Sequence, residues 1–323
     1  MSETIPKIIF IVPYRSRKQQ LIHFKMYMTR YILEDYNLED YEIFFVHQFD
    51  SRPFNRGAMK NIGFIAMKEK YPDHYKNITF VFNDIDTLPS FKDLLNYRTD
   101  HGFIKHFYGF EYTLGGIVSV TGKDFEIMNG FPNYWAWGLE DNDLQHRVRL
   151  NNFTIDRRVF FKFGDPNIIS INSTTNRIQS KQQPWRCGPK NKEGITDITN
   201  LKYNFENDMI HVHNFITPFD PAKDNYVNEK HNARVNFDNR FRPNNALVNN
   251  SDVLQANKDI MKVKILKNND NAVDTSVKDE PKNIPNINIQ NTNSLPNKYS
   301  IINNNMKSNK GRYHQINNLL KIF

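Results

Sequence analysis

Hydrophobic and polar positions follow two different patterns along the first third of the chain. Continuous runs of β-branched and aromatic residues, such as IIFIV at 8–12, predict strands that are covered on both faces. Between these runs, apolar residues recur every three or four positions, which predicts helices. The order is strand, helix, strand, helix, strand, over residues 7–14, 18–36, 41–49, 56–71 and 77–86. Strands that alternate with helices predict an α/β fold with a parallel sheet.

Polar clusters follow each of the three predicted strands. Arg15 and Arg17 come after the first strand, Arg56 after the second, and Asp84 and Asp86 after the third. Ligands of open α/β sheets bind outside the carboxyl ends of the strands, so these side chains are expected to meet at one mouth. Arginines beside carboxylates suggest an anionic ligand that arrives with a metal ion.

The two aspartates of this mouth are separated by one residue. Side chains two apart share a face of an extended backbone, so one carboxylate could bind a divalent cation while the other holds a ligand hydroxyl. Paired aspartates also occur in ordinary surface loops. A capped turn ahead of Pro89 is therefore an alternative explanation of Asp84 and Asp86.

A second acidic cluster lies in the segment YWAWGLEDND, where Glu140, Asp141 and Asp143 follow Trp135 and Trp137. A structural explanation is a helix N-terminus, capped by Asp141 or the asparagine after it, with acidic neighbours that complement the helix dipole. It leaves the two tryptophans unexplained. Aromatic faces beside carboxylates can stack on sugar rings and accept their hydroxyl hydrogen bonds, so carbohydrate contact is the competing interpretation.

Two histidines, His211 and His213, lie in the short apolar segment MIHVH. In a strand they would share a face and could chelate one metal ion, although a role in the core is also open. Together with one aspartate they would form a mixed oxygen and nitrogen ligand set, which suits Mn²⁺.

Composition separates the chain into two parts near residue 245. Residues 1–245 are expected to form one folded domain, whereas 246–323 are rich in Asn and Lys and predict a disordered or weakly ordered tail. The tail holds 11 Lys and Arg against 6 Asp and Glu, so it supplies most of the formal net charge of +8. It lacks interleaved aromatic residues, which argues against nucleic-acid binding.

Cysteine usage and hydropathy indicate the cellular compartment in which the chain is expected to work. The single cysteine, Cys187, excludes an internal disulfide and a cysteine-rich zinc site. The apolar run near the N-terminus is about five residues long, shorter than the roughly 7–15 of a signal peptide or the roughly 20 of a transmembrane helix. We therefore expect a soluble, reduced, intracellular chain without a transmembrane segment.

Five segments, taken in order, resemble the β-1,4-galactosyltransferase family: FIVPYRSR, PFNRGAMKNIGF, FVFNDIDTLP, the block at 115–143, and MIHVH. The likeness spans roughly residues 8–215, and the order and spacing of the segments make it more specific than any single motif. It implies a GT-A-like nucleotide-sugar-binding fold, which is a Rossmann-like mixed sheet flanked by helices. It also implies an inverting transferase that depends on Mn²⁺ and moves a hexose, most simply galactose, from a UDP-sugar to a saccharide or glycoconjugate acceptor.

The resemblance carries over to individual positions. The donor-binding residues it implies are Pro13, Arg15, Arg17, Phe54, Arg56, Asp84 and Trp137. The metal ligands it implies are Asp86, His211 and His213. Asp141 matches the catalytic base, with Glu140 beside it, and the acceptor side is expected to comprise Tyr134, Gly138 and Asn142.

Departures from the family pattern leave the substrates open. Thr113 and Leu114 stand before the glycine pair where many members have Tyr-Phe, so the donor could carry an N-acetylhexosamine instead of galactose. Asn142 replaces the third residue of an acidic run that helps to hold the acceptor. The family's usual membrane anchor is not seen, which favours a cytoplasmic microbial or viral glycan pathway.

Two other classes compete with the transferase. One is a catalytically inactive carbohydrate-binding or scaffold protein that keeps the fold, and the other is a metal-dependent phosphohydrolase. The phosphohydrolase would leave the tryptophan segment without a purpose. Loss of catalysis should have altered at least one of Asp86, His213 and Asp141, which are all present.

Overall fold

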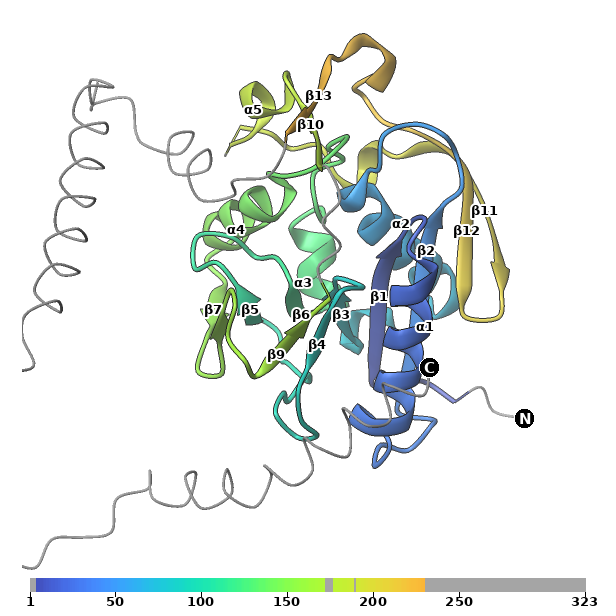
Figure 1. Ribbon diagram of the computed structural model, residues 1–323, viewed down its shortest axis with the longest axis vertical. Helices are drawn as coiled ribbons and strands as arrows, with labels where there is room; N and C mark the ends of the chain where they lie inside the picture. The colour runs from blue at the N-terminus through green and yellow to red at the C-terminus, as the bar shows by residue number, and fades with distance from the viewer. Residues whose placement is uncertain (1–3, 172–176, 189, 230–323) are drawn as a thin grey trace, which may run out of the picture. The chain divides into compact units, whose positions relative to one another are not determined.

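The computed structural model describes residues 4–171, 177–188 and 190–229, and the tail expected from residue 246 lies outside them. Within the described part, a large mixed sheet has the strand order β11-β12-β2-β1-β3-β6-β5-β7, with β8 paired to β5 (Figure 1). Its strands are β1 (Ile8–Tyr14), β2 (Tyr41–Gln48), β3 (Thr79–Asn83), β5 (Phe103–Gly109), β6 (Ile117–Thr121), β7 (Thr154–Asp156), β8 (Phe161–Lys162), β11 (Thr199–Glu206) and β12 (Met209–Ile216). Two small sheets pair β4 (Thr87–Pro89) with β9 (Ile168–Ser170), and β10 (Arg177–Ser180) with β13 (Tyr226–Glu229).

The helices are short apart from the one that follows β2. They are α1 (Lys18–Tyr27), α2 (Arg56–Lys70), α3 (Gly122–Ile127), α4 (Glu140–Leu150) and α5 (Gln183–Arg186). Single turns of 3-10 helix lie at Tyr75–Asn77, Ile195–Asp197 and Pro221–Lys223. Among the described residues, none of these helices has the length and apolar content needed to cross a membrane.

The predicted strand-helix repeat forms the parallel centre of the sheet. Strand β1 lies between β2 and β3 and is parallel to both, with Ile8 opposite Tyr41 on one side and Thr79 on the other. Strand β6 then continues the sheet antiparallel to both β3 and β5, and β5 is parallel to β7 and β8. The mixed α/β architecture expected from the sequence is confirmed.

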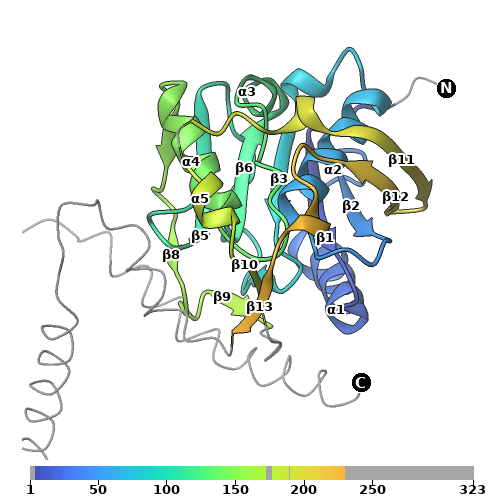
Figure 2. The same ribbon diagram turned by 90° about the horizontal axis from the view of Figure 1, so that it is seen from above.

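Each face of the sheet buries its own apolar core. On one face, alternate side chains of β1 and β3 pack with residues of α2, α3 and α4. On the other face, the intervening side chains pack with α1 and with the strand pair β4 and β9. Figure 2 shows α1 on the opposite side of β1 and β3 from α3. Continuous apolar strands follow from this double covering.

Two predicted boundaries differ from the structure. The helix expected over 18–36 ends as α-helix at Tyr27 and continues as one π-helical turn at Met28–Ile32. The third strand, expected to extend to residue 86, ends at Asn83. Asp84 and Asp86 therefore lie in the turn that leads to β4, so their side chains do not follow the alternation of a strand.

Helix α2 approaches the sheet closely at Gly63. A Cβ atom at this position would lie 2.6 Å from Cγ2 of Ile11 and 2.8 Å from Cγ2 of Val46. We predict that Gly63→Ala destabilises the fold by about 1–3 kcal/mol, because overpacking outweighs the better helix propensity of alanine. Thermal unfolding measures this, with the exposed α1 position Gln19→Ala as the control. An unchanged or raised Tm for Gly63→Ala would show that α2 is not packed this tightly.

Candidate functional site

Helix α2 presents two cations at the carboxyl ends of the parallel strands. Arg56 and Lys60 lie one turn apart at its start. Asn55 caps this helix by accepting a 2.8 Å hydrogen bond from the Ala58 N–H, and its amide donates to the Asn133 carbonyl at 2.9 Å. The same side chain therefore begins the helix and attaches it to the segment that leads to α4.

Three carboxylates surround these two cations. Nε of Arg56 donates to Oε1 of Glu140 at 2.6 Å. The two terminal nitrogens of Arg56 contact the aspartates, at 3.3 Å from Asp141 Oδ2 and 3.5 Å from Asp84 Oδ2. Nζ of Lys60 lies 3.2 Å from Asp141 Oδ1 and 3.8 Å from Asp84 Oδ1. Lys60 is only 2% exposed. The five side chains form one largely buried charge cluster with a surplus carboxylate.

The cluster shifts the pKa values of two of its aspartates in opposite directions. Burial raises the pKa of Asp141 to about 6, with Lys60 opposing the rise and Glu140 adding to it. Burial also acts to raise the pKa of Asp84, but Arg56 and Lys60 outweigh it and lower the pKa overall. Asp84 is thus a permanent anion at neutral pH, whereas Asp141 can take up or release a proton near neutrality.

A glycine makes room for the Asp141 carboxylate. A Cβ atom on Gly115 would lie 2.5 Å from Asp141 Oδ2, so any larger residue here would displace this carboxylate. The neighbouring Leu114 N–H donates to the Asp141 carbonyl at 3.0 Å. Leu114 therefore binds the backbone of Asp141, and Gly115 leaves room for its side chain, although the two segments are separated in sequence.

Helix α4 begins at Glu140, and its N-cap is Leu139 in a left-handed conformation with φ of 77°. The prediction that Asp141 or Asn142 would be the N-cap was wrong. Asn142 lies within the first turn and is 4% exposed; its amide donates to the Tyr112 carbonyl at 3.3 Å. Its Oδ1 is buried and accepts no hydrogen bond from the described residues.

The residues after β1 contact a different part of the mouth. Arg17 donates to Asp86 Oδ2 at 2.5 Å, and Arg15 donates to the Arg52 carbonyl. Asp84 contacts the cations of α2, so the two aspartates of the turn pair with arginines from different segments. Of the other residues expected to bind the donor, Pro13 is buried within β1 and Phe54 packs against the core on the α2 face.

The tryptophan segment is attached to strand β10. The backbone N–H of Trp137 donates to the Ile178 carbonyl at 2.9 Å, and the Arg177 guanidinium lies over the Trp137 ring at 4.3 Å. Both Asp84 and Asp86 act on the pKa of Arg177, so this arginine faces the mouth. Gly138 follows with φ of 106° and open space beside it. A cation missed by the sequence interpretation is thereby placed near the expected donor.

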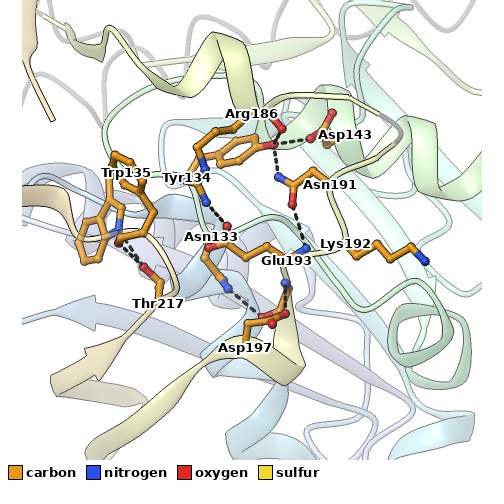
Figure 3. A network of polar contacts seen from close by, with 12 residues as sticks. Asn133, Tyr134, Trp135, Asp143, Arg186, Asn191, Lys192, Glu193, Asp197 and Thr217 are labelled. Carbon is orange, nitrogen blue, oxygen red and sulfur yellow. Dashed lines mark hydrogen bonds and ion pairs between the residues drawn. The ribbon is translucent and has the colours of Figure 1, made fainter. Parts of the chain in front are cut away.

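Two aromatic residues of this segment are buried, contrary to the expected ligand contacts (Figure 3). Trp135 is 1% exposed, donates from Nε1 to Thr217 Oγ1 at 3.0 Å and stacks on Phe215. Tyr134 is also 1% exposed, and its hydroxyl donates to Asp143 Oδ2 at 2.6 Å. Tyr134 was expected to bind the acceptor, but its side chain instead attaches the segment to α4.

The structure does not assemble the three predicted metal ligands. Among the described residues, no group of three or more His, Cys, Asp or Glu side chains is arranged to hold a metal ion. Asp86 follows β3, and two strands separate β3 from β12, which carries His211 and His213. Nε2 of His211 lies 3.1 Å from Glu206 Oε2. Oxygen and imidazole ligands suit Mn²⁺ by type, but their arrangement here does not fit the predicted set.

Two functional candidates escaped the sequence interpretation. Lys60 has a local signal, because it lies four residues after Arg56 and so shares its helix face. Arg177 has none, since its neighbours are decided by contacts between segments that are distant in sequence.

Comparison with known proteins accounts for this arrangement. Residues 2–99 match the N-terminal region of glycosyl transferase group 7, and residues 101–170 match the N-terminal domain of galactosyltransferase. The chain belongs to glycosyltransferase family 7, the β-1,4-galactosyltransferase family. The matched residues of this family 7 chain include Arg56, Asp84, Asp86 and Asp141.

Curated relatives align with about half of this family 7 chain. It is 32% identical to mouse β-1,4-galactosyltransferase 4 over 48% of the chain and 46% of the relative. It is 32% identical to the xylosylprotein 4-beta-galactosyltransferase of Caenorhabditis elegans over 47% of the chain and 53% of the relative. The chain thus spans about half the length of these proteins.

A solved structure supports the fold. The catalytic domain of Drosophila β-1,4-galactosyltransferase 7, in complex with xylobiose, superposes with a TM-score of 0.53 at 23% identity, covering 68% of this chain and 97% of the other. A mutant of that Drosophila protein was solved with manganese, UDP-Gal and xylobiose. The family 7 chain therefore has the GT-A galactosyltransferase fold.

The raised pKa of Asp141 has a consequence for stability. A carboxyl whose pKa is raised on folding stabilises the folded state below its unfolded pKa of about 4, and this contribution is lost as pH rises through about 6. We predict that Asp141→Asn stabilises the protein by on the order of 2–3 kcal/mol at pH 8, because no charge is then buried, and that the gain vanishes near pH 4.

Denaturant unfolding of wild type and Asp141→Asn across this pH range measures the gain. Asp73→Asn is the matched control, because Asp73 is exposed and lies away from the cluster. A gain that does not depend on pH would contradict the assigned shift.

Proposed function

We propose that this chain transfers a hexose, with galactose the first candidate, from a UDP-sugar to a hydroxyl group of a sugar acceptor, with inversion. The observation that carries the proposal is the buried Asp141 carboxylate, held by Lys60 and Arg56 beside the charged Asp84. A general base works best when its pKa lies near the working pH, and burial moves Asp141 toward that range. Family membership supports the choice of donor and acceptor class.

The donor fits the cationic side of the mouth. A nucleoside diphosphate carries several negative charges, and the guanidinium groups of Arg15, Arg17 and Arg177 lie on segments that border the mouth. Arginine binds phosphate oxygens well because its planar fork can donate two hydrogen bonds at once. The Drosophila relative was solved with UDP-Gal, which supports a UDP-sugar here.

The reaction is a single displacement. Asp141 accepts the proton of the acceptor hydroxyl while that oxygen attacks the anomeric carbon, and the bond from this carbon to the diphosphate oxygen breaks. Attack from the face opposite the leaving group inverts the configuration. The arginines stabilise the charge that grows on the departing UDP.

The support for a manganese cofactor is the structure of the Drosophila relative, which was solved with manganese. The residues predicted to bind Mn²⁺ here do not form a three-ligand set, so no step of the mechanism above uses the metal. The alternative function, an inactive carbohydrate-binding or scaffold protein, is disfavoured by the intact charge cluster, since withdrawing these charges from water lowers stability and a scaffold does not need them.

The first test measures UDP release from a panel of UDP-sugars, with Mn²⁺ or with EDTA, and with N-acetylglucosamine, glucose or xylose as acceptor. We expect release from one donor to rise when an acceptor is added. Asp141→Asn should lower the rate by about 10²–10⁴-fold, because it removes the general base, while UDP binding is retained.

The control for this test is Asp73→Asn, which should behave as wild type. If no donor is turned over and calorimetry detects no UDP binding, the transferase proposal fails and the scaffold alternative stands. If Asp141→Asn turns over as fast as wild type, another group is the base.

Arg177 gives a second test of the donor site. We predict that Arg177→Gln raises the KM for the UDP-sugar several-fold, because a cation facing the diphosphate is lost and the Trp137 ring loses its partner. Steady-state kinetics measure KM, with Arg158→Gln as the control, since Arg158 is exposed and pairs with Asp156. Equal KM values in both variants would remove Arg177 from the donor site.

A further inference from the structure

A buried histidine on β5 lies outside the charge cluster at the mouth. His106 is fully buried, and its Nε2 lies 2.9 Å from the Tyr108 carbonyl oxygen and 3.1 Å from the Gly115 carbonyl oxygen. Carbonyl oxygens only accept hydrogen bonds, so Nε2 carries the ring proton and Nδ1 is an acceptor. Nε of Arg157 donates to this Nδ1 at 3.0 Å. The ring is therefore bonded on both sides.

The direction of these bonds is fixed by the surroundings of the ring. Burial, with the Arg157 guanidinium acting in the same sense, lowers the pKa of His106 to about 3, so the imidazole is neutral near neutral pH. The opposite tautomer would set a lone pair against two carbonyl oxygens and an N–H against the guanidinium. Phe160 packs against both side chains, with its ring centroid 4.8 Å from the imidazole centroid and 5.5 Å from the guanidinium carbon.

Arg157 joins three parts of the chain through one half-buried side chain. Besides His106 on β5, its Nη2 donates to the Thr113 carbonyl at 3.3 Å and to Oε1 of Gln145 at 2.7 Å. Gln145 lies in α4 and is buried. Arg157 thus connects β5, helix α4 and the segment 110–116, which links β5 to β6.

The segment 110–116 contacts the first turn of α4 through its backbone. The Tyr112 carbonyl accepts a hydrogen bond from the Asn142 amide at 3.3 Å, and the Leu114 N–H donates to the Asp141 carbonyl at 3.0 Å. The residues of α4 that are bonded here therefore include the proposed base.

The bonds from the arginine and the histidine fall on either side of Leu114. They reach the carbonyls of Thr113 and Gly115, the residues before and after it. A Cβ atom on Gly115 would lie 2.5 Å from Asp141 Oδ2, so this backbone and the carboxylate are close neighbours. The position of the Asp141 carboxylate therefore depends on where the two bonds hold the segment.

We propose that Arg157 and His106 form a positioning pair, which holds the segment 110–116 against α4 and so sets where the Asp141 carboxylate lies relative to the acceptor hydroxyl. This role rests on the proposed function, because Asp141 is the base only there. Neither residue of the pair touches the reacting atoms. A misplacement of about 1 Å can lower a rate by about 10²-fold, so the pair acts on kcat. The arginines proposed to bind the donor lie on other segments, so donor binding does not depend on the pair.

Steady-state kinetics of Arg157→Lys test this role. Lysine keeps the charge, but its single ammonium cannot reach the three acceptors with the geometry of a guanidinium. We expect kcat to fall about 10–100-fold while the KM for the UDP-sugar stays within about twofold of the wild-type value. Arg158→Gln is the matched control, since the neighbouring arginine is exposed and pairs with Asp156. A kcat equal to that of the control, or a change confined to KM, would overturn the proposal.

A conservative variant separates the hydrogen bond of His106 from its volume. His106→Leu fills similar space without a donor, whereas the side-chain amide of His106→Gln can donate to the Gly115 carbonyl. We expect kcat to be several-fold higher in His106→Gln than in His106→Leu. Equal values would remove His106 from the pair. Circular dichroism checks that each variant is folded.

Amide hydrogen exchange at Leu114 reports the position of the segment without any activity. The Leu114 N–H donates to the Asp141 carbonyl, so release of the segment opens this bond. We expect Arg157→Lys to speed exchange at Leu114 at least about tenfold, and Arg158→Gln to leave it unchanged. Unchanged exchange in Arg157→Lys would overturn the proposal whether or not the chain is a transferase. Faster exchange in a chain whose wild type turns over no UDP-sugar would support the pair and remove the transferase.

Discussion

The pairing of two cations with three carboxylates, all largely withdrawn from solvent, is the constraint on which the rest of the mouth depends. Arg56 and Lys60 cannot satisfy Asp84, Glu140 and Asp141 equally, and a buried charge without a partner costs several kcal/mol. Asp141 carries the surplus, and its burial raises its pKa to about 6, with Lys60 opposing the rise and Glu140 adding to it. The surrounding fold must hold this unbalanced cluster together.

The fold meets this demand with rigid elements and close packing. Asn55 begins α2 and attaches it to the chain ahead of α4, so the cations and the carboxylates have a common anchor. Gly115 lets the backbone of the segment after β5 reach the Asp141 carboxylate. Gly63 lets α2 lie against β1 and β2. Small residues at these points set distances that larger side chains would increase.

Neighbouring residues of the tryptophan segment serve different purposes. Trp135 and Tyr134 are buried and attach the segment to Thr217 and to Asp143, as Figure 3 shows. Trp137 instead lies against Arg177 and is bonded through its backbone to β10. Because Tyr134 and Trp135 are fixed in the core, the residues that follow them have a defined position, although the segment is neither helix nor strand.

Local patterns alone were enough to predict the strand-helix repeat, an α/β fold and the placing of Arg56 and Asp84 at one mouth, because periodicity and the end of a parallel strand are short-range properties. Tertiary structure decided the rest. Among the described residues it does not gather Asp86 and the histidines into a group that could hold a metal ion, since β12 joins the sheet beside β2, and no local pattern encodes that order. It buried Tyr134 and brought Arg177 to the mouth, because both outcomes depend on contacts between residues forty or more positions apart.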